Sequence, residues 1–451
     1  MVRQVREAEA RERAQRAVDI AMTMGASEAE ARIVLARRFN AAARGERVTQ
    51  LDFSEGRSLS MRLFIEQRKA TLVGTHWTDD EIRSGVATAL EQARFAGVDR
   101  FAGLPDPQSV PSRDLDLYDR KIEERLDEER LDDVRSVERS IREADRRIDN
   151  SNGSHYSDAC VTLALANSSG MVGSYRGTQV GISASPVASD GAYKRTAHYG
   201  SAARFLSHLD TPDAIAREAV RRTVAFYRAT KPKTQTTTIL FDREVAASVL
   251  DDIFSACNAA NVAIGNSWLA GRTGERIGSD LVDILDDGTI PGALGSSPFD
   301  AEGTPSQRTP VFERGVLRSF LFDAYYARRL GAKSTGNAVA GGIGPNTFFL
   351  APGSASLEEL IASTKQGILV LETIGFATEH ASGLYSRGAR GIAICNGELA
   401  EPLEEFTIAA PFPEMLAGID AVANDLKFDG SIASPSFRVA EMQVSGSSSA
   451  P

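Results

Sequence analysis

Hydrophobic positions recur every three or four residues near the beginning of the chain. Within residues 3–24 they are Ala14, Val18, Ala21 and Met22, and the residues between them are rich in Arg and Glu. This spacing places the apolar side chains on one side of a helix. We therefore predict a charged N-terminal helix.

Three further helices are indicated in the first half. Thr78–Phe95 opens on a capping box, and Thr211–Tyr227 opens on a Thr-Pro pair that suits the first turn of a helix. Residues 126–148 are strongly charged, which is typical of a solvated helix with one buried edge. The apolar stripe of the helix predicted over residues 126–148 consists of Leu131, Val134, Val137, Ile141 and Ile148.

Alternating patterns predict strands between these helices. Residues 29–35, 58–65 and 69–75 alternate at least partly with a period of two. Between residues 159 and 200, short β-type runs are separated by turns rich in Gly, Ser and Asn, which is typical of an antiparallel meander. The first half is therefore predicted to be an α/β domain with an antiparallel-rich sheet.

The second half opens with a β-branched strand over residues 234–242, followed by a helix over Glu244–Cys257. Strand-like runs and glycine-rich turns then dominate, with one later helix over Leu357–Gln366. The Asp-Asp-Gly-Thr segment at residues 286–289 suits a type I′ turn. A β-rich domain is predicted here, so the fold class is α+β.

Lys231-Pro232-Lys233 follows the helix at residues 211–227 and is the expected domain boundary. The expected organisation is a charged N-terminal helix (1–25), an α/β domain (26–230), a β-rich domain (231–446) and a disordered Ser-rich tail (447–451).

Composition and charge narrow the classes of function. The 451 residues include 51 Lys and Arg against 61 Asp and Glu, and the net charge of −10 argues against sequence-independent binding of nucleic acid. The three cysteines lack CxxC spacing, so neither a zinc ribbon nor a dithiol redox site is indicated. The N-terminus is too charged for a secretory signal, and no apolar run approaches the ~18 residues of a membrane span. We expect a cytoplasmic protein without nucleic-acid or membrane partners.

The stretch from Phe299 to Asn337 resembles a known family in the order of its parts. Residues 299–317 are FDAEGTPSQRTPVFERGVL, and residues 320–338 are FLFDAYYARRLGAKSTGNA. These segments resemble the Asp-x-Glu-Gly-x-Pro-Thr and Ser-Thr-Gly-Asn signatures of the TldD/PmbA metallopeptidase family, with Ser306 in place of the threonine. The resemblance covers nearly the whole chain and is most specific in the second half.

The resemblance implies both an architecture and a partner. Members of the family combine an N-terminal α/β domain with a β-rich, barrel-like C-terminal domain, and two related subunits pair, one of which carries the metal. We interpret the carboxylates of Asp300 and Glu302 as holding a tight loop. The structural residues of the family signatures are Asp300, Glu302, Gly303, Gly315, Gly336 and Asn337.

A zinc site similar to the family's needs the motif His-Glu-x-x-x-His on the helix after the first strand of the C-terminal domain, with histidines as ligands and the glutamate to activate water. Residues 243–262 contain no histidine. Depending on the alignment, the ligand positions fall on Asp251 and Ala256, or on Leu250 and Ser255. The family's late cysteine ligand is missing as well. We therefore expect no metal in this chain.

None of the five histidines lies three or four residues from another. His380, Tyr385 and Ser386 occupy a loop where the family has a Thr-Gly-Asp-x-Ser-like segment, and they are candidates for facing the cavity or the substrate. An ordinary loop histidine is the preferred interpretation of His380. No catalytic residue and no metal ligand is assigned to this chain.

The resemblance implies a metal-free, TldE/PmbA-like subunit of a heterodimer whose TldD-like partner carries zinc. This chain would not be catalytic itself. It would shape the substrate cavity and bind an unfolded peptide beside the partner's zinc. One alternative is a tailoring hydrolase pair that acts on a modified peptide or an amide-containing small molecule in a natural-product pathway. Another is a homodimeric binding or scaffold protein without catalysis.

Overall fold

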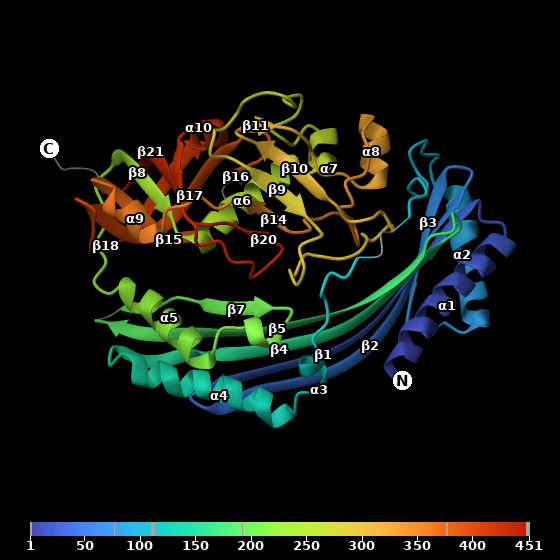
Figure 1. Ribbon diagram of the computed structural model, residues 1–451, viewed down its shortest axis with the longest axis horizontal. Helices are drawn as coiled ribbons and strands as arrows, with labels where there is room; N and C mark the ends of the chain where they lie inside the picture. The colour runs from blue at the N-terminus through green and yellow to red at the C-terminus, as the bar shows by residue number, and fades with distance from the viewer. Residues whose placement is uncertain (1, 76, 110–112, 192, 376–377, 448–451) are drawn as a thin grey trace.

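The chain forms a long curved sheet covered by helices and a second half built around a closed ring of strands (Figure 1). The computed structural model describes residues 2–75, 77–109, 113–191, 193–375 and 378–447. The second half lies against one face of the long sheet (Figure 1). The predicted α+β class, with an antiparallel sheet followed by a barrel-like domain, is confirmed.

The N-terminal sheet has the strand order β3-β2-β1-β4-β5-β6, with β7 paired to β5. Neighbouring strands are antiparallel, and β1, β2, β4 and β5 are 17 to 20 residues long. The strands are β1 (Glu28–Arg44), β2 (Arg47–Ile65), β3 (Arg68–Gly74), β4 (Ile148–Asn167), β5 (Val172–Asp190), β6 (Tyr193–Thr196) and β7 (Tyr199–Ala203).

Helices cover one face of this sheet in two pairs. Helices α1 and α2 pack over one end, on side chains such as Ile33 and Leu63, and α4 and α5 pack over the other end, on Phe39 and Tyr156. Successive side chains of a strand point to opposite faces, so the other face is left for the second half. The helices are α1 (Val2–Thr23), α2 (Asp79–Phe95), α3 (Arg120–Glu124), α4 (Asp127–Ala144) and α5 (Pro212–Ala225), with a 3-10 turn η1 (Leu206–His208).

The helix predictions hold in this half, with two errors in detail. The capping box of α2 forms, because the Thr78 hydroxyl accepts from the Glu81 N–H at 3.3 Å and the Glu81 carboxylate accepts from the Thr78 N–H at 2.8 Å. Helix α4 ends at Ala144, so Ile148 begins β4 and does not belong to the helical stripe. Met22 is 37% exposed and also lies outside the buried stripe.

Five strands of the second half close into a barrel. Their order is β15-β8-β21-β18-β17, and β17 also pairs with β15, which completes the ring. Strands β16 and β19 extend this sheet, a second sheet has the order β11-β10-β9-β14-β20, and β12 and β13 form a hairpin. The strands of the barrel sheet are β8 (Gln235–Phe241), β15 (Gln366–Ile374), β16 (Thr378–Glu379), β17 (Leu384–Cys395), β18 (Glu398–Pro411), β19 (Ile419–Val422) and β21 (Phe437–Ser445). The others are β9 (Ile284–Asp287), β10 (Arg308–Glu313), β11 (Val316–Leu317), β12 (Ala338–Val339), β13 (Gly342–Ile343), β14 (Phe348–Leu350) and β20 (Ile432–Ala433).

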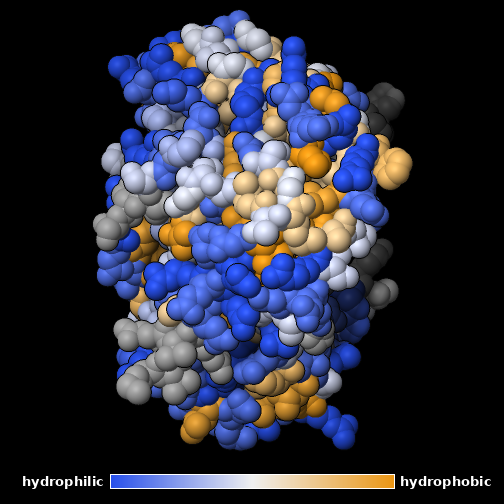
Figure 2. All heavy atoms as spheres, turned by 90° about the vertical axis from the view of Figure 1, so that its right-hand side faces the viewer, coloured by the Kyte–Doolittle hydropathy of each residue, from blue (hydrophilic) through white to orange (hydrophobic). Residues whose placement is uncertain are grey.

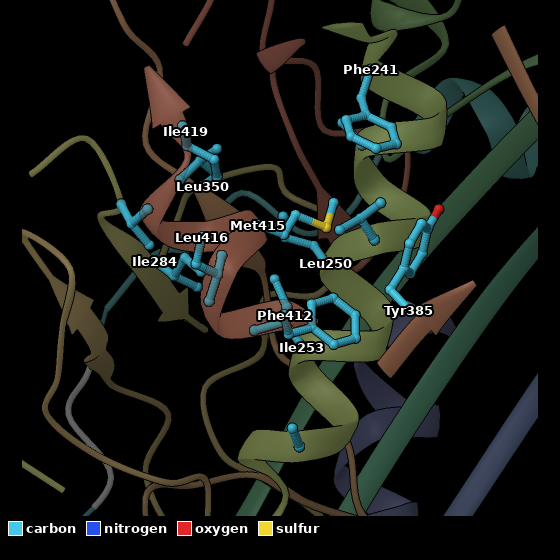
Figure 3. Close-up of a cluster of buried hydrophobic side chains, with 14 of the residues drawn as sticks. Phe241, Leu250, Ile253, Ile284, Leu350, Tyr385, Phe412, Met415, Leu416 and Ile419 are labelled. Atoms are coloured by element: carbon cyan, nitrogen blue, oxygen red, sulfur yellow. The ribbon is translucent and has the colours of Figure 1, made fainter. Parts of the chain in front are cut away.

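One hydrophobic cluster joins the barrel, the second sheet and helix α6 (Arg243–Cys257). In Figure 3, Leu250 and Ile253 of α6 lie beside Phe412 and Met415 of α10, and Tyr385 of β17 lies along the same helix. Helix α6 is therefore fixed by packing on its apolar side. The remaining helices are α7 (Ala259–Ala263), α8 (Ala324–Leu330), α9 (Leu357–Ala362) and α10 (Phe412–Ala417).

The prediction of a type I′ turn at Asp-Asp-Gly-Thr is wrong. Asp286 and Asp287 are buried at the end of β9, and neither Asp287 nor Gly288 has the positive φ that such a turn requires. Pairing with β10 and β14 holds this segment as a strand.

The C-terminal end of the chain returns to the start of the second half. Ser447 forms a bridge with Lys233, and the rest of the expected disordered tail (447–451) lies outside the described residues. None of the described helices is both long enough and apolar enough to cross a membrane.

Candidate functional site

Helix α6 occupies the place where the resemblance puts a zinc motif. Its N-cap is Asp242, whose carboxylate accepts from the Glu244 N–H at 3.2 Å. Leu250 is 2% exposed and Ala256 is fully buried, so these two positions belong to the hydrophobic core. Of the four expected ligand positions, Asp251 is the exposed one, and Ser255 is half-buried.

The carboxylate next to Asp251 is already neutralised. Arg387 of β17 donates to the buried Asp252 at 2.7 Å, and its guanidinium also donates to the Gly375 carbonyl at 3.2 Å. Partial burial, followed by the charge of Asp252, raises the pKa of Asp251, while Arg387 and His380 oppose the rise. Among the described residues, no group of three or more His, Cys, Asp or Glu side chains is placed to hold a metal ion. The residues around α6 do not fit zinc.

Of the three candidate residues, His380 and Tyr385 reach this corner between α6 and β17. Tyr385 is completely buried, and Arg387 lies over its ring at 5.7 Å from the centroid. Burial raises the pKa of the Tyr385 hydroxyl. In the part of the chain that the structure describes, neither the Tyr385 hydroxyl nor Nδ1 of His380 has a hydrogen-bond partner, although both atoms are buried. Ser386 is half-buried and follows Tyr385 on the strand, so its side chain leaves from the other face.

Arg387 was missed by the sequence reasoning. Tyr385 and Ser386 lie on strand β17, not in the predicted loop. On a strand, a cation two residues after Tyr385 shares its face, but the loop prediction hid this period. Its partner Asp252 lies 135 positions earlier in the chain, and nothing local to either residue indicates that they meet.

Asp300 organises the Asp-x-Glu-Gly loop through its buried carboxylate. It accepts from the N–H groups of Glu302 and Thr304, both at 2.9 Å, and from that of Ala338 at 3.0 Å. Burial, and next the charge of Glu302, raises the pKa of Asp300 to about 7, although the three N–H donors favour the ionised form. Gly303, at φ +82°, completes the turn of this loop.

Glu302 connects the loop to the N-terminal sheet. Its carboxylate accepts from Arg62 of β2 and, at 2.9 Å, from the N–H of Ala324 at the start of α8. Arg62 also pairs with Glu30 of β1 at 2.6 Å, and these two residues are directly opposite each other in the sheet. Burial raises the pKa of Glu30, against the attraction of Arg62. One guanidinium thus holds two buried carboxylates from different halves of the molecule.

Asn337 connects the last signature segment to β9. Its amide donates to the Asp286 carboxylate at 2.7 Å and to the Gly344 carbonyl at 3.0 Å. Burial raises the pKa of Asp286 to about 6, against hydrogen bonds from Asn337 and Asn346. Gly336 beside it has φ +72°, and a Cβ there would lie 2.7 Å from the Pro305 carbonyl oxygen.

A cleft of about 670 Å³ opens between the two halves beside the Glu30–Arg62–Glu302 group. Its walls include Tyr325 of α8 and Val339 at the tip of the β12–β13 hairpin. The side of the molecule that carries β3, α2 and α8 is mostly hydrophilic, with small separate apolar patches (Figure 2). Concave sites of this volume between domains commonly hold small ligands or short peptide segments.

Two family models match the sequence. The PmbA/TldA metallopeptidase central domain matches residues 120–227, and the PmbA/TldA metallopeptidase C-terminal domain matches residues 234–446. The chain is 29% identical to the metalloprotease PmbA of Escherichia coli O157:H7 over 401 residues, which is 88% of each chain. It is 27% identical to a PmbA homologue from Haemophilus influenzae over 447 residues, covering 98% of this chain and 97% of the other.

Solved structures share the fold. TldE from Thermococcus kodakarensis superposes with a TM-score of 0.89 at 20% identity, over 96% of this chain and 99% of that one. A candidate modulator of DNA gyrase from Bacteroides thetaiotaomicron gives a TM-score of 0.90 at 24% identity, over 97% and 98%. At such identities the likeness establishes a common architecture.

Proposed function

The chain belongs to the PmbA/TldD metallopeptidase family, and from that membership we propose that it is a metal-free subunit of a heterodimeric peptidase. The partner would be a related, TldD-like chain that carries zinc. The complex would work in the cytoplasm on peptide substrates, with all of the metal chemistry in the partner.

The observation that carries this proposal is the state of helix α6. Leu250 and Ala256 are packed in the core, and Asp252 is held by Arg387 at 2.7 Å. A zinc ion bound at the expected positions of this helix would have to disrupt a packed core, and none of these positions supplies a histidine or cysteine ligand. These features of α6 support a role without metal for this chain.

The role left to this chain is to shape the substrate cavity. The cleft between its two halves is large enough for a few residues of an extended peptide. The ion pairs of Arg62 with Glu30 and Glu302 hold part of its wall in place. Recognition through backbone groups of an extended peptide gives little sequence preference. Selection would then depend on which segments are unfolded enough to enter.

Complex formation tests this proposal. When the chain is co-expressed with a TldD-like protein that contains His-Glu-x-x-x-His, native mass spectrometry should find a 1:1 heterodimer with one zinc. The matched control is the same partner with both motif histidines changed to alanine, which should retain the heterodimer and lose the zinc. A stable homodimer of this chain that forms no complex with the TldD-like protein would contradict the proposal and favour a binding or scaffold role.

A further inference from the structure

The helix-covered face of the N-terminal sheet has an open window between its two helix pairs. The hydrophobic cluster under α1 and α2 extends along β1 as far as Ile33, and the cluster under α4 and α5 begins at Phe39. Between them lies a cleft of about 680 Å³ whose floor is the sheet. This volume suits a small molecule.

Two cross-strand rows form the floor of the window. One row is Arg57, Leu35, Thr162 and Arg176, and the next is Glu55, Arg37 and Cys160. Rows on one face of a sheet are about 7 Å apart, and strands are about 5 Å apart. Three guanidinium groups therefore rise from a small area of a sheet face that is otherwise covered by the apolar sides of helices. A helix could not cover these rows without burying charge.

Two of these guanidinium groups form no ion pair with a described carboxylate. Arg37 donates to the Glu123 backbone carbonyl at 3.1 Å, and among the described residues no carboxylate pairs with Arg37 or Arg57. Each instead lies over an aromatic ring, at 5.4 and 5.2 Å from the centroid. Arg176 differs, because it is paired with the Glu123 carboxylate at 3.1 Å.

Other charged groups border the window. Arg13 adds a positive charge from α1, while Glu9 of α1 and Glu55, directly opposite Arg37, add negative charge. These carboxylates reduce the positive electrostatic potential of the window. The binding free energy of an anion must therefore come from directed hydrogen bonds as well as from charge attraction. A planar guanidinium supplies these bonds, since its fork of N–H groups fits two oxygens of a phosphate or carboxylate.

We propose that this window binds a small oxyanion, presented by a phosphate or carboxylate group, between Arg37 and Arg57. The ligand takes the place of the missing ion-pair partners. Arg37 and Arg57 lie on a diagonal of the floor, with Leu35 opposite Arg57 and Glu55 opposite Arg37 at the other two corners. The site is separate from the cleft between the two halves and does not depend on the proposed peptidase role.

Calorimetric titration of the full chain with inorganic phosphate, pyrophosphate and citrate tests the site. We expect at least one of these probes to bind. Tighter binding of the phosphates or of citrate shows whether the site prefers a phosphate or a carboxylate group. Arg37→Gln and Arg57→Gln should each weaken the affinity at least tenfold. Glu55→Gln should strengthen it several-fold, because it removes a negative charge opposite Arg37.

Arg38 provides the matched control. It is exposed on the same strand, next to Arg37, and its side chain leaves from the opposite face. Arg38→Gln should leave the affinity unchanged. The proposal is overturned if none of the three probes binds, or if Arg38→Gln weakens binding as much as Arg57→Gln, since the effect would then come from diffuse charge.

Discussion

At the scale of single residues, buried charges tie the two halves of this molecule together. Arg62 from the N-terminal sheet holds Glu30 and Glu302, whose side chains are only 5% and 8% exposed. Removing one partner from a buried ion group leaves the others uncompensated, which costs far more than losing a surface pair.

Arg62→Met should therefore lower the free energy of unfolding by about 3 kcal/mol. The methionine keeps much of the apolar stem and removes only the guanidinium. Arg120→Met is the control, because the Arg120–Glu124 pair is exposed, and it should cost less than about 0.5 kcal/mol. Urea denaturation of both variants measures the difference, and equal effects would argue against the clamp.

Asp300 should make stability depend on pH. Its pKa is raised to about 7 in the folded state, against about 4 for an unfolded aspartate. A raised pKa means that the folded protein binds the proton more tightly, so this contribution is complete below about pH 4 and is lost as the pH rises through 7.

Asp300→Asn removes this titration. Between pH 4 and pH 8, the stability of the natural protein should fall relative to the variant by on the order of 4 kcal/mol. Chemical denaturation at a series of pH values measures both profiles. If the two profiles run parallel, Asp300 ionises at an ordinary pH and the expectation fails.

Single residues also mark what the sequence could predict about the candidate site. A family resemblance pointed to His380 and Tyr385, and the structure places both beside α6. Their contact with a cavity or substrate stays a prediction. Arg387 and the role of Asp286 were not found. Asp286 meets Asn337 and Asn346, which lie 51 and 60 positions away, and such contacts leave no local pattern.

At the scale of elements, the turn at Arg314-Gly315 leaves less room for a Cβ than any other glycine position between Phe299 and Asn337. Gly315 has φ +76°, and a Cβ there would lie 2.1 Å from the Gly278 carbonyl oxygen. Gly271 has nearly the same φ, +79°, but no described atom lies within 4 Å of its Cβ position. Comparing the two glycines therefore separates the free-energy cost of a left-handed backbone from the cost of a steric clash with the added Cβ.

Gly271→Ala should destabilise the protein by about 1 kcal/mol, the cost of a left-handed conformation for a residue with a Cβ. Gly315→Ala should cost at least about 3 kcal/mol, because overpacking against backbone is added to that term. Thermal and chemical unfolding of the two variants gives the comparison. Similar values would mean that the strand β11 yields easily.

Element by element, the starts of the longer helices were predicted well because their signals are local. The helix predicted to end at Gln366 ends at Ala362, and Gln366 begins β15. The Thr78 and Thr211 caps set the starts of α2 and α5, and both form as expected. Strands were predicted only in part. Residues 47–57 of β2 are mostly exposed on both faces and alternate between apolar and polar only over residues 51–54, so the strand is defined by pairing with β1. The Asp-Asp-Gly-Thr error has the same cause, since β10 and β14 decide the conformation.

At the scale of the whole molecule, the family fold is retained around helix α6, whose expected ligand positions carry neither histidine nor cysteine. The barrel closes, the signature loops form their buried hydrogen bonds, and the second half rests on the long sheet (Figure 1). In the proposed complex, the catalytic metal is supplied by the partner subunit. The proposed heterodimer therefore accounts for a peptidase fold whose metal face is filled by Leu250, Ala256 and the Asp252–Arg387 pair.

The most direct test is hydrolysis of an unstructured fluorogenic peptide, measured together with bound zinc, for this chain alone and for its complex with a TldD-like partner. The isolated chain should hold no stoichiometric zinc and release no product, while the complex should hold one zinc and cleave the peptide. Zinc-dependent cleavage by the isolated chain would contradict the account.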